Sequence, residues 1–288
     1  MNIRILTTAA LALAVTAAFA ADKPFTKTFE RTLNVAAAPN VSVATGSGYI
    51  HLSPGSDSQI HIVGHVHANN SWFSGDSSSR VEQIANHPPI VQNGNSIVIG
   101  PERHNGDLYS NIAIDYDISL PRASSINATT GSGSVQIQDV GASLKATSGS
   151  GTVRAEGIHG PADLQTGSGS IYLQQTASGD VRAQTGSGSI QLSGLSGGLK
   201  AGTGSGSIKA SGQPTADWKL DTGSGSIQLA LGNSAHYTLN ASTGSGSIRT
   251  AQPIAIRGEI NKHHVTGTVN GGGPSIRANT GSGSITIN

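Results

Sequence analysis

The sequence predicts an all-β protein, a parallel β-solenoid (β-helix) with coils of about 18–19 residues. Two observations predict this class. A twelve-residue frame, of the form apolar, any, apolar, any, Thr, Gly, Ser, Gly, Ser, Ile, any, apolar, occurs nine times. From Val135 to Ile227 its central Ile or Val recurs every 18 or 19 residues, a period typical of solenoids and of arrays of small β units.

Each frame is expected to form two short strands around a corner. In residues 181–192, apolar and polar residues alternate before the glycines and again after them, which predicts strands. The first apolar residue, Val181 here, lies nine positions before the central Ile190, and an odd offset would put the two apolar sets on opposite faces of an unbroken strand. The Gly-Ser-Gly segment must therefore turn or bulge the chain. Glycine suits such a corner through its access to positive φ and because backbones can approach it closely.

Linkers of six to nine residues join successive frames of the central array. Many carry one apolar residue among turn formers, as Val140, Ile158 and Leu195 do, which predicts a third side to each coil. Equivalent residues of stacked coils would then lie about 4.8 Å apart. The alternative treats Gly-Ser-Gly as a hairpin loop and gives antiparallel β-hairpin repeats in a sandwich or prism.

Residues 1–20 are expected to be a secretory signal peptide. Arg4 precedes an apolar run over residues 5–19, and residues 18–20 fit the small-x-small cleavage rule. The alternative, a retained membrane anchor, has an apolar run shorter than the roughly 20 residues of a spanning helix. We therefore expect an exported protein that lies either in the periplasm or outside the cell, including the cell surface. No transmembrane segment is expected after cleavage.

Composition excludes several classes of protein. The chain has no cysteine, so it has neither a disulfide framework nor a lipid-modified cysteine. Loss of Arg4 on cleavage leaves 16 basic residues against 16 acidic ones, and only 11% of residues are charged. This neutral balance lacks the basic footprint of a nucleic-acid binder. The fixed apolar spacing also argues against a disordered Gly/Ser-rich chain.

Residues 21–125 are expected to form an N-terminal β region and cap, and residues 126–288 a repeat β-solenoid continuous with it. Broader strands are predicted in the alternating runs of the N-terminal region, at residues 60–67, 96–99 and 112–120. Residues 68–95 are predicted to be a long loop.

The ninth frame ends almost at the last residue, so we expect a thin C-terminal cap. Either the last strand docks onto a partner, or the degenerate coil over residues 251–275 folds over it.

A family resemblance rests on three features. These are the tandem Thr-Gly-Ser-Gly-Ser-Ile units, the leading segment 25–35, and Ile118-Ser119-Leu120-Pro121 before the array. They resemble the bacterial putative-adhesin family with β-strand repeats, a domain of unknown function related to the auto-transporter adhesin head domain. The resemblance covers nearly the whole mature chain and implies an extracytoplasmic β-helical protein without catalytic residues.

No catalytic constellation is predicted. Residues 194–198 match Gly-x-Ser-x-Gly, but that elbow requires a strand-to-helix turn, and this stretch is predicted to lie between coils. Asp115 and Asp117 come nearest to the carboxylate pair of a glycoside hydrolase. They alternate with apolar residues in one strand and are predicted to form its solvent face.

A group of histidines is a candidate metal site. His61, His65 and His67 share one strand parity, and His51 is predicted on a neighbouring strand, so imidazole ligands would converge. A polar outward face is favoured instead, because the spacing places no acidic partner beside them. No metal and no cofactor are therefore expected.

Two features are candidates for ligand contact. Trp72 and Phe73 lie in a polar segment outside the frame, and are expected either to contact a glycan or protein or to pack onto the N-terminal cap. Trp218 occupies an apolar frame position and is predicted in the core. The Ser and Thr ladders are expected to satisfy each other and nearby backbone, with a polysaccharide- or ice-binding lattice as the alternative.

The function expected is that of a non-enzymatic exported β-repeat protein with an adhesin-like or structural binding role at the cell envelope. Its expected partner is a glycan or a cell-surface protein. The alternative is a polysaccharide-binding or polysaccharide-degrading β-helix protein. The sequence does not indicate an oligomeric state.

Overall fold

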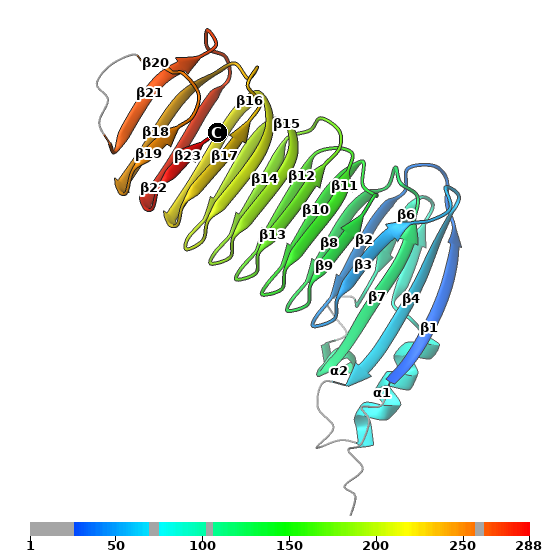
Figure 1. Cartoon of the computed structure of the whole chain (residues 1–288). Coiled ribbons are helices and arrows are strands. Elements are labelled where there is room, and N and C mark those ends of the chain that lie inside the picture. The colour runs from blue at the N-terminus through cyan, green and yellow to red at the C-terminus, as the bar shows by residue number, and fades with distance from the viewer. Residues whose placement is uncertain (1–25, 69–74, 102–105, 257–261) are drawn as a thin grey trace, which may run out of the picture.

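The computed structural model describes residues 26–68, 75–101, 106–256 and 262–288. Its strands form a large, mostly parallel sheet that winds along an elongated molecule (Figure 1). Two rows of strands run along the stack, the first row before the Gly-Ser-Gly turns and the second row after them. In the described ranges, no helix has the length and hydropathy of a membrane span.

The first row stacks the strand that opens each frame, in parallel and in register. In spatial order its strands are β2 (Asn40–Thr45), β8 (Ser125–Thr130), β10 (Ser143–Ser148), β12 (Ala162–Thr166), β14 (Val181–Thr185), the second halves of β15 (Ile190–Thr203) and β16 (Ile208–Ser224), β22 (Ser275–Ser282) and β18 (Tyr237–Ser245). Val181 pairs with Ala162 on one side and with Leu199 on the other.

The second row stacks the strand that closes each frame. Its strands are β7 (Ile112–Leu120), β3 (Ile50–Pro54), β9 (Val135–Gln138), β11 (Val153–Ile158), β13 (Ile171–Gln175), the first halves of β15 and β16, β17 (Ile227–Leu231), β23 (Ile285–Ile287) and β19 (Ile248–Thr250). Ile190 pairs in parallel with Ile171 and Ile208. Parallel stacking, rather than hairpin pairing within a frame, is therefore the arrangement of the described frames.

One core runs between the two rows. The inward positions of a frame, such as Val181, Ala183 and Ile190, are all buried. The apolar linker residues Val140, Ile158 and Leu195 are buried with them, so the linkers also contribute to the core. Trp218 is 1% exposed, as predicted for a core position, and its indole Nε1 donates to the Gly197 carbonyl at 2.9 Å.

Close packing of backbones explains the glycines of the corner. A Cβ on Gly188 would overlap the carbonyl oxygen of Gly169 in the neighbouring frame, and one on Gly186 would overlap that of Gly167. Neither Gly186 nor Gly188 has positive φ. The expected close approach of backbones is thus confirmed at this corner. The expected positive φ is wrong there, because the chain turns through conformations open to any residue.

The frame threonine hydrogen-bonds the corner of its own frame to the corner of a neighbouring frame. Thr185 is buried, its Oγ1 donates to the Gly169 carbonyl at 2.8 Å, and it accepts from the Gly188 amide at 3.1 Å. The same hydroxyl-to-carbonyl bond is made from the equivalent Thr130, Ser148, Thr166, Thr203, Thr222, Thr243 and Thr280. These hydroxyl groups therefore satisfy buried backbone groups, so they are not available to form a ligand-binding lattice.

The C-terminal end departs from the expected order. The ninth frame does not follow the eighth in space: β22 lies between β16 and β18, and β23 lies between β17 and β19 (Figure 1). The cap is instead antiparallel, with β21 (His264–Val269) on β18 and β20 (Ala255–Ile256) on β21. Both predicted ways of covering the last strand are wrong, because near-identical frames allow that strand to insert inside the stack.

The N-terminal end is closed by broader strands and two helices. β4 (Gln59–Ala68) pairs antiparallel with β7, and β1 (Thr26–Asn34) pairs antiparallel with β4. β6 (Ser96–Ile99) stacks on β2 and carries β5 (Ile90–Asn93) along its other edge. The three predicted strand runs are confirmed as β4, β6 and β7.

The predicted loop over residues 68–95 is wrong in its second half. This part of the chain forms α1 (Gly75–Asn86) and β5, and a short α2 (Gly106–Tyr109) follows β6. Helix α1 packs against β1 and β4 and buries Val81 and Ile84. Two apolar side chains in a polar stretch are a weak sequence signal for a helix, which is why tertiary packing decides this segment.

Candidate functional site

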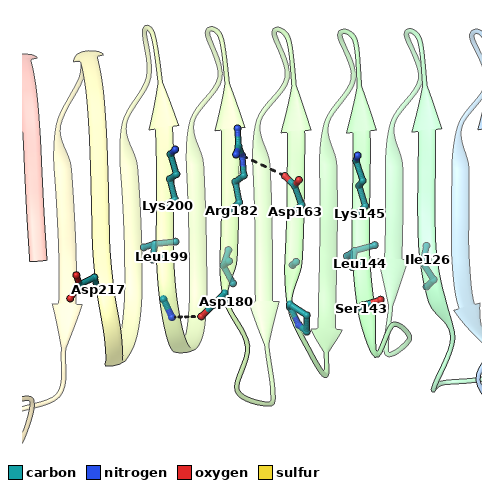
Figure 2. Close-up of a pocket in the computed structure, with 14 residues that line it drawn as sticks. Ile126, Ser143, Leu144, Lys145, Asp163, Asp180, Arg182, Leu199, Lys200 and Asp217 are labelled. Atoms are coloured by element: carbon teal, nitrogen blue, oxygen red, sulfur yellow. Dashed lines mark hydrogen bonds and ion pairs between the residues drawn. The ribbon is translucent and has the colours of Figure 1, made fainter. Parts of the chain in front are cut away.

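An open groove with a volume of about 550 Å³ lies on the outer face of the first row. It crosses successive strands from β8 to β16 near their starts (Figure 2). Lys145, Asp163, Arg182 and Lys200 line it on the outer side, and the edges of core residues such as Leu199 form part of its floor. The groove therefore crosses equivalent positions of consecutive frames.

The frame explains how these side chains come together. Side chains alternate along a strand, so the residue after the first buried apolar position points outward. Parallel pairing in register then places Lys145 beside Asp163, Asp163 beside Arg182, and Arg182 beside Lys200. Arg182 Nε lies 3.9 Å from Asp163 Oδ1. The result is a line of charged groups across the sheet.

The groove carboxylates already have partners. Asp180 accepts from the Gly198 amide at 2.8 Å (Figure 2), and Asp217 accepts from the Ser275 amide at 2.8 Å. Asp163 accepts from Gln165 Nε2 at 2.9 Å in addition to its ion pair with Arg182. Since these carboxylates fix backbone or neighbouring side chains, the arrangement is suited to holding polar groups rather than to general acid–base chemistry.

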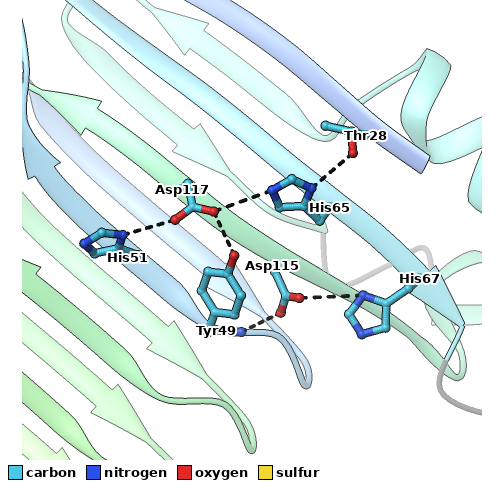
Figure 3. A network of polar contacts seen from close by, with 7 residues as sticks. All are labelled: Thr28, Tyr49, His51, His65, His67, Asp115 and Asp117. Carbon is cyan, nitrogen blue, oxygen red and sulfur yellow. Dashed lines mark hydrogen bonds and ion pairs between the residues drawn. The ribbon is translucent and has the colours of Figure 1, made fainter. Parts of the chain in front are cut away.

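A second polar constellation lies on the second row near the N-terminal end (Figure 3). Asp117 of β7 contacts His51 Nδ1 at 3.1 Å and His65 Nε2 at 3.6 Å, and it accepts from the Tyr49 hydroxyl at 2.7 Å. The expectation that these histidines have no acidic neighbour is wrong. Antiparallel pairing of β4 with β7 sets Asp115 opposite His65 in register, so that His65 contacts Asp117 and His67 contacts Asp115. Strand parity alone does not reveal these contacts.

The remaining histidines contact different carboxylates. His67 Nδ1 lies 3.7 Å from Asp115, which also accepts from the Tyr49 amide, and His61 Nε2 lies 3.5 Å from Glu30. Within the described ranges, no group of three or more His, Cys, Asp or Glu residues is arranged to hold a metal ion. Asp115 and Asp117 line the outward side of β7, as predicted.

The surroundings of Tyr49 perturb its acidity. Partial burial raises the pKa of the Tyr49 phenol well above its ordinary value, and the hydrogen bond to Asp117 and the charge of that carboxylate act in the same direction. The Tyr49 hydroxyl therefore stays a hydrogen-bond donor across the physiological range, and it orients Asp117 between the two histidines.

The remaining candidate residues, Trp72, Phe73 and Ser196, do not form a common site among the described residues. Trp72 and Phe73 lie outside the described residues, so their contact with a ligand stays a prediction. Ser196 lies within strand β15, paired with Gln213, and its Oγ is 3.1 Å from that of Ser178. It is not at a strand-to-helix turn.

Sequence reasoning missed the groove residues. The available signal was the second frame position, which is charged in consecutive copies at Lys145, Asp163, Arg182, Lys200 and Lys219.

A family model described as Toastrack DUF4097 matches residues 40–288. This confirms the resemblance to a β-repeat family of unknown function. No curated protein matches the chain significantly.

Three of the solved structures that match the chain come from bacteria. A "putative cell adhesion protein" of Clostridium sporogenes ATCC 15579 has 13% identity and a TM-score of 0.31, over 91% of this chain and 99% of that one. A "putative adhesin" of Bacteroides fragilis NCTC 9343 has 10% identity and a TM-score of 0.39, over 91% and 97%. A "putative lipid binding protein" of Parabacteroides distasonis ATCC 8503 has 13% identity and a TM-score of 0.46, over 91% and 96%.

Proposed function

The chain belongs to the Toastrack DUF4097 family, and we propose that it is a non-enzymatic, adhesin-like binding protein of the cell envelope that holds an extended ligand in the groove of the first row. The single observation that carries this proposal is the groove itself. It is open, it spans consecutive frames, and it presents charged side chains at equivalent positions of successive strands. A binding site of this form suits a ligand that is itself a chain of repeated units.

The length of the groove follows from the stacking of the frames. We propose a β-solenoid with coils of 18 or 19 residues, supported by the pairing of Val181 with Leu199 and of Ile171 with Ile190. Residues 126–288 would form this solenoid, residues 21–125 would form the N-terminal β region and cap continuous with it, and residues 1–20 would be removed on export. The site of action would then be the periplasm or the cell surface.

The partner proposed is a glycan rather than a cell-surface protein. Asp163, Arg182 and Lys200 offer acceptors and donors at short intervals, and the groove lining contains no Trp or Tyr of the kind that dominates protein interfaces. Trp72 and Phe73 would provide a separate contact. The alternative is polysaccharide degradation, which requires a carboxylate free to donate a proton, whereas Asp180 and Asp217 are engaged by backbone amides.

Blocking the groove tests the proposal. Ser143 lines the groove at the start of β10, and Ser143→Trp would fill it with a bulky side chain while leaving the core positions unchanged. The matched control is Gln136→Trp, on the outer face of β9 in the second row. Both variants are applied to a glycan array and incubated with the bound polysaccharides, after circular dichroism has verified their folding.

We expect binding without cleavage for the wild type and for Gln136→Trp, and loss of binding for Ser143→Trp. Equal binding by all three proteins would place the contact outside the groove. Release of shorter oligosaccharides would establish the degradative alternative.

A further inference from the structure

We infer that the ligand of the groove is an acidic polysaccharide of uronic-acid type, held through its carboxylates by a row of cations. This inference rests on the proposed function and names its ligand. The cation row consists of Lys145, Arg182, Lys200, Lys219 and Arg277, which all stand at the same outward position of their frames.

The register makes this row nearly continuous. Arg182 pairs with Lys200, Lys200 with Lys219, and Lys219 with Arg277, so four cations stand side by side on four neighbouring strands. Arg277 joins the row only because the ninth frame inserts beside the seventh. Neighbouring parallel strands are about 4.8 Å apart, so the row offers one positive charge per strand spacing.

Such a row is electrostatically costly by itself. Like charges directly opposite one another on a sheet destabilise it. Asp163 lies 3.9 Å from Arg182, and Asp221 lies 3.6 Å from Lys219, which offsets two of the charges. Among the described residues, Lys145, Lys200 and Arg277 have no carboxylate within ion-pair distance. An external chain of anions would offset the charge that the protein leaves uncompensated.

The rest of the lining selects a polyuronate over a polyphosphate or a nucleic acid. Asp163, Asp180 and Asp217 line the same groove as Lys145, Arg182 and Lys200, and Lys219 and Arg277 continue the cation row beyond the lining. They repel a ligand that carries only dense negative charge, and they accept hydrogen bonds from a ligand that also carries hydroxyl groups. A uronate polymer carries both one carboxylate and free hydroxyls on each sugar, and its sugars repeat at a distance comparable to the strand spacing. This combination matches a lining in which the cations Lys145, Arg182 and Lys200 stand together with the acceptors Asp163, Asp180 and Asp217.

The face opposite provides a control with the same residue types. Lys209 on β16 and Arg249 on β19 point outward from the second row and are exposed. They are separated there by Gln228 and Thr286, because β17 and β23 intervene. The second row thus has cations without a continuous cation row.

The experiment measures binding of fluorescent oligogalacturonate to the full mature chain by polarisation, at neutral pH and low salt. The double variant Lys200→Gln/Arg277→Gln removes two of the three cations that lack an ion pair, and Lys209→Gln/Arg249→Gln removes the same charge from the other face. We expect the first to weaken binding by on the order of tenfold and the second to change it less than about twofold. Because the cations are exposed, added salt should weaken wild-type binding more than that of the first variant.

The outcomes separate this inference from the proposed function. Equal affinity of wild type for oligogalacturonate and its methyl ester, or tighter binding of polyphosphate or single-stranded DNA, overturns the acidic-polysaccharide assignment. If Ser143→Trp abolishes binding of a neutral glycan that the double variant still binds, the groove function stands and the cation row is not its basis. If neither variant changes binding of any ligand, both proposals fail.

Discussion

The stacked frames and the two ends of the stack are stabilised differently. In the frames, small residues dominate the corner: the backbone of Gly188 packs on that of Gly169, and Thr185 bonds across the contact. At the N-terminal end, the Phe29 ring covers Gly64 and meets Tyr116 edge-on, with ring centroids 6.3 Å apart. The repeated frames are thus stabilised by identical backbone contacts, whereas the N-terminal end depends on large side chains that occur once.

The largest effect is expected from filling the corner. Gly188→Val would push a side chain into the Gly169 carbonyl, where rigid backbone cannot yield, and we expect a loss of about 3 kcal/mol or more in unfolding free energy. Gln191→Lys, on the exposed face of the same frame, should change stability by less than about 0.5 kcal/mol. Urea denaturation measures both. Equal, mild effects would show that the corner is not the stabilising contact.

The end frame provides a second control at an equivalent position. Gly186→Ala meets the Gly167 carbonyl, whereas the corresponding Gly46 of the first frame has no atom within 4 Å of an added Cβ. Gly46→Ala should therefore be tolerated, and Gly186→Ala should be destabilising. If the two variants melt alike, the cost of a side chain does not come from stacking.

A smaller effect is expected from removing one frame hydroxyl. Thr185→Val keeps the size of the side chain but leaves the Gly169 carbonyl and the Gly188 amide without their partner, which should cost about 1–3 kcal/mol. Thr129→Val, at an exposed position of β8, is the matched control and should be nearly neutral. Thermal melting of both variants tests the comparison, and a neutral Thr185→Val would mean that water replaces the hydroxyl.

The smallest effects are expected from two buried tyrosines toward opposite ends. Tyr237 donates to the buried Gln252 Oε1 at 2.9 Å, so Tyr237→Phe should cost about 1–2 kcal/mol. The Tyr116 hydroxyl is buried and has no hydrogen-bond partner among the described residues, so Tyr116→Phe should be neutral or stabilising. Denaturation midpoints at neutral pH compare the two; the opposite ranking would refute the assigned hydrogen bonding.

The two tyrosines are also expected to affect stability at alkaline pH. Burial raises the pKa of Tyr237 to about 12, and burial also raises that of Tyr116. The unfolded chain loses these protons near pH 10 while the native chain retains them, so stability is unaffected below about pH 10 and falls as pH rises toward 12. Each Phe variant should lose less stability than wild type over that interval. An unchanged alkaline slope in both variants would assign the titration to other groups.

The candidate site was less predictable than the fold. Strand parity placed Val181 and Ile190 in the core, and the spacing of the frames predicted their stacking. The same parity put His65 and Asp117 on outward faces but said nothing of their contact, because strands β4 and β7 are far apart in sequence and pair antiparallel. The groove could not be predicted without knowing which outward positions of different frames become neighbours.

The sequence by itself determined the repeated unit: two strands, a glycine corner, a buried threonine and an inward-facing apolar set. These follow from alternation, spacing and the size of each residue, which act locally. Only the tertiary structure decided the order of the frames. Because the frames are almost identical, the sequence does not distinguish which of them pair, whereas in the structure β22 pairs with both β16 and β18, and β21 pairs along the other edge of β18. That insertion sets Arg277 beside Lys219 and extends the cation row.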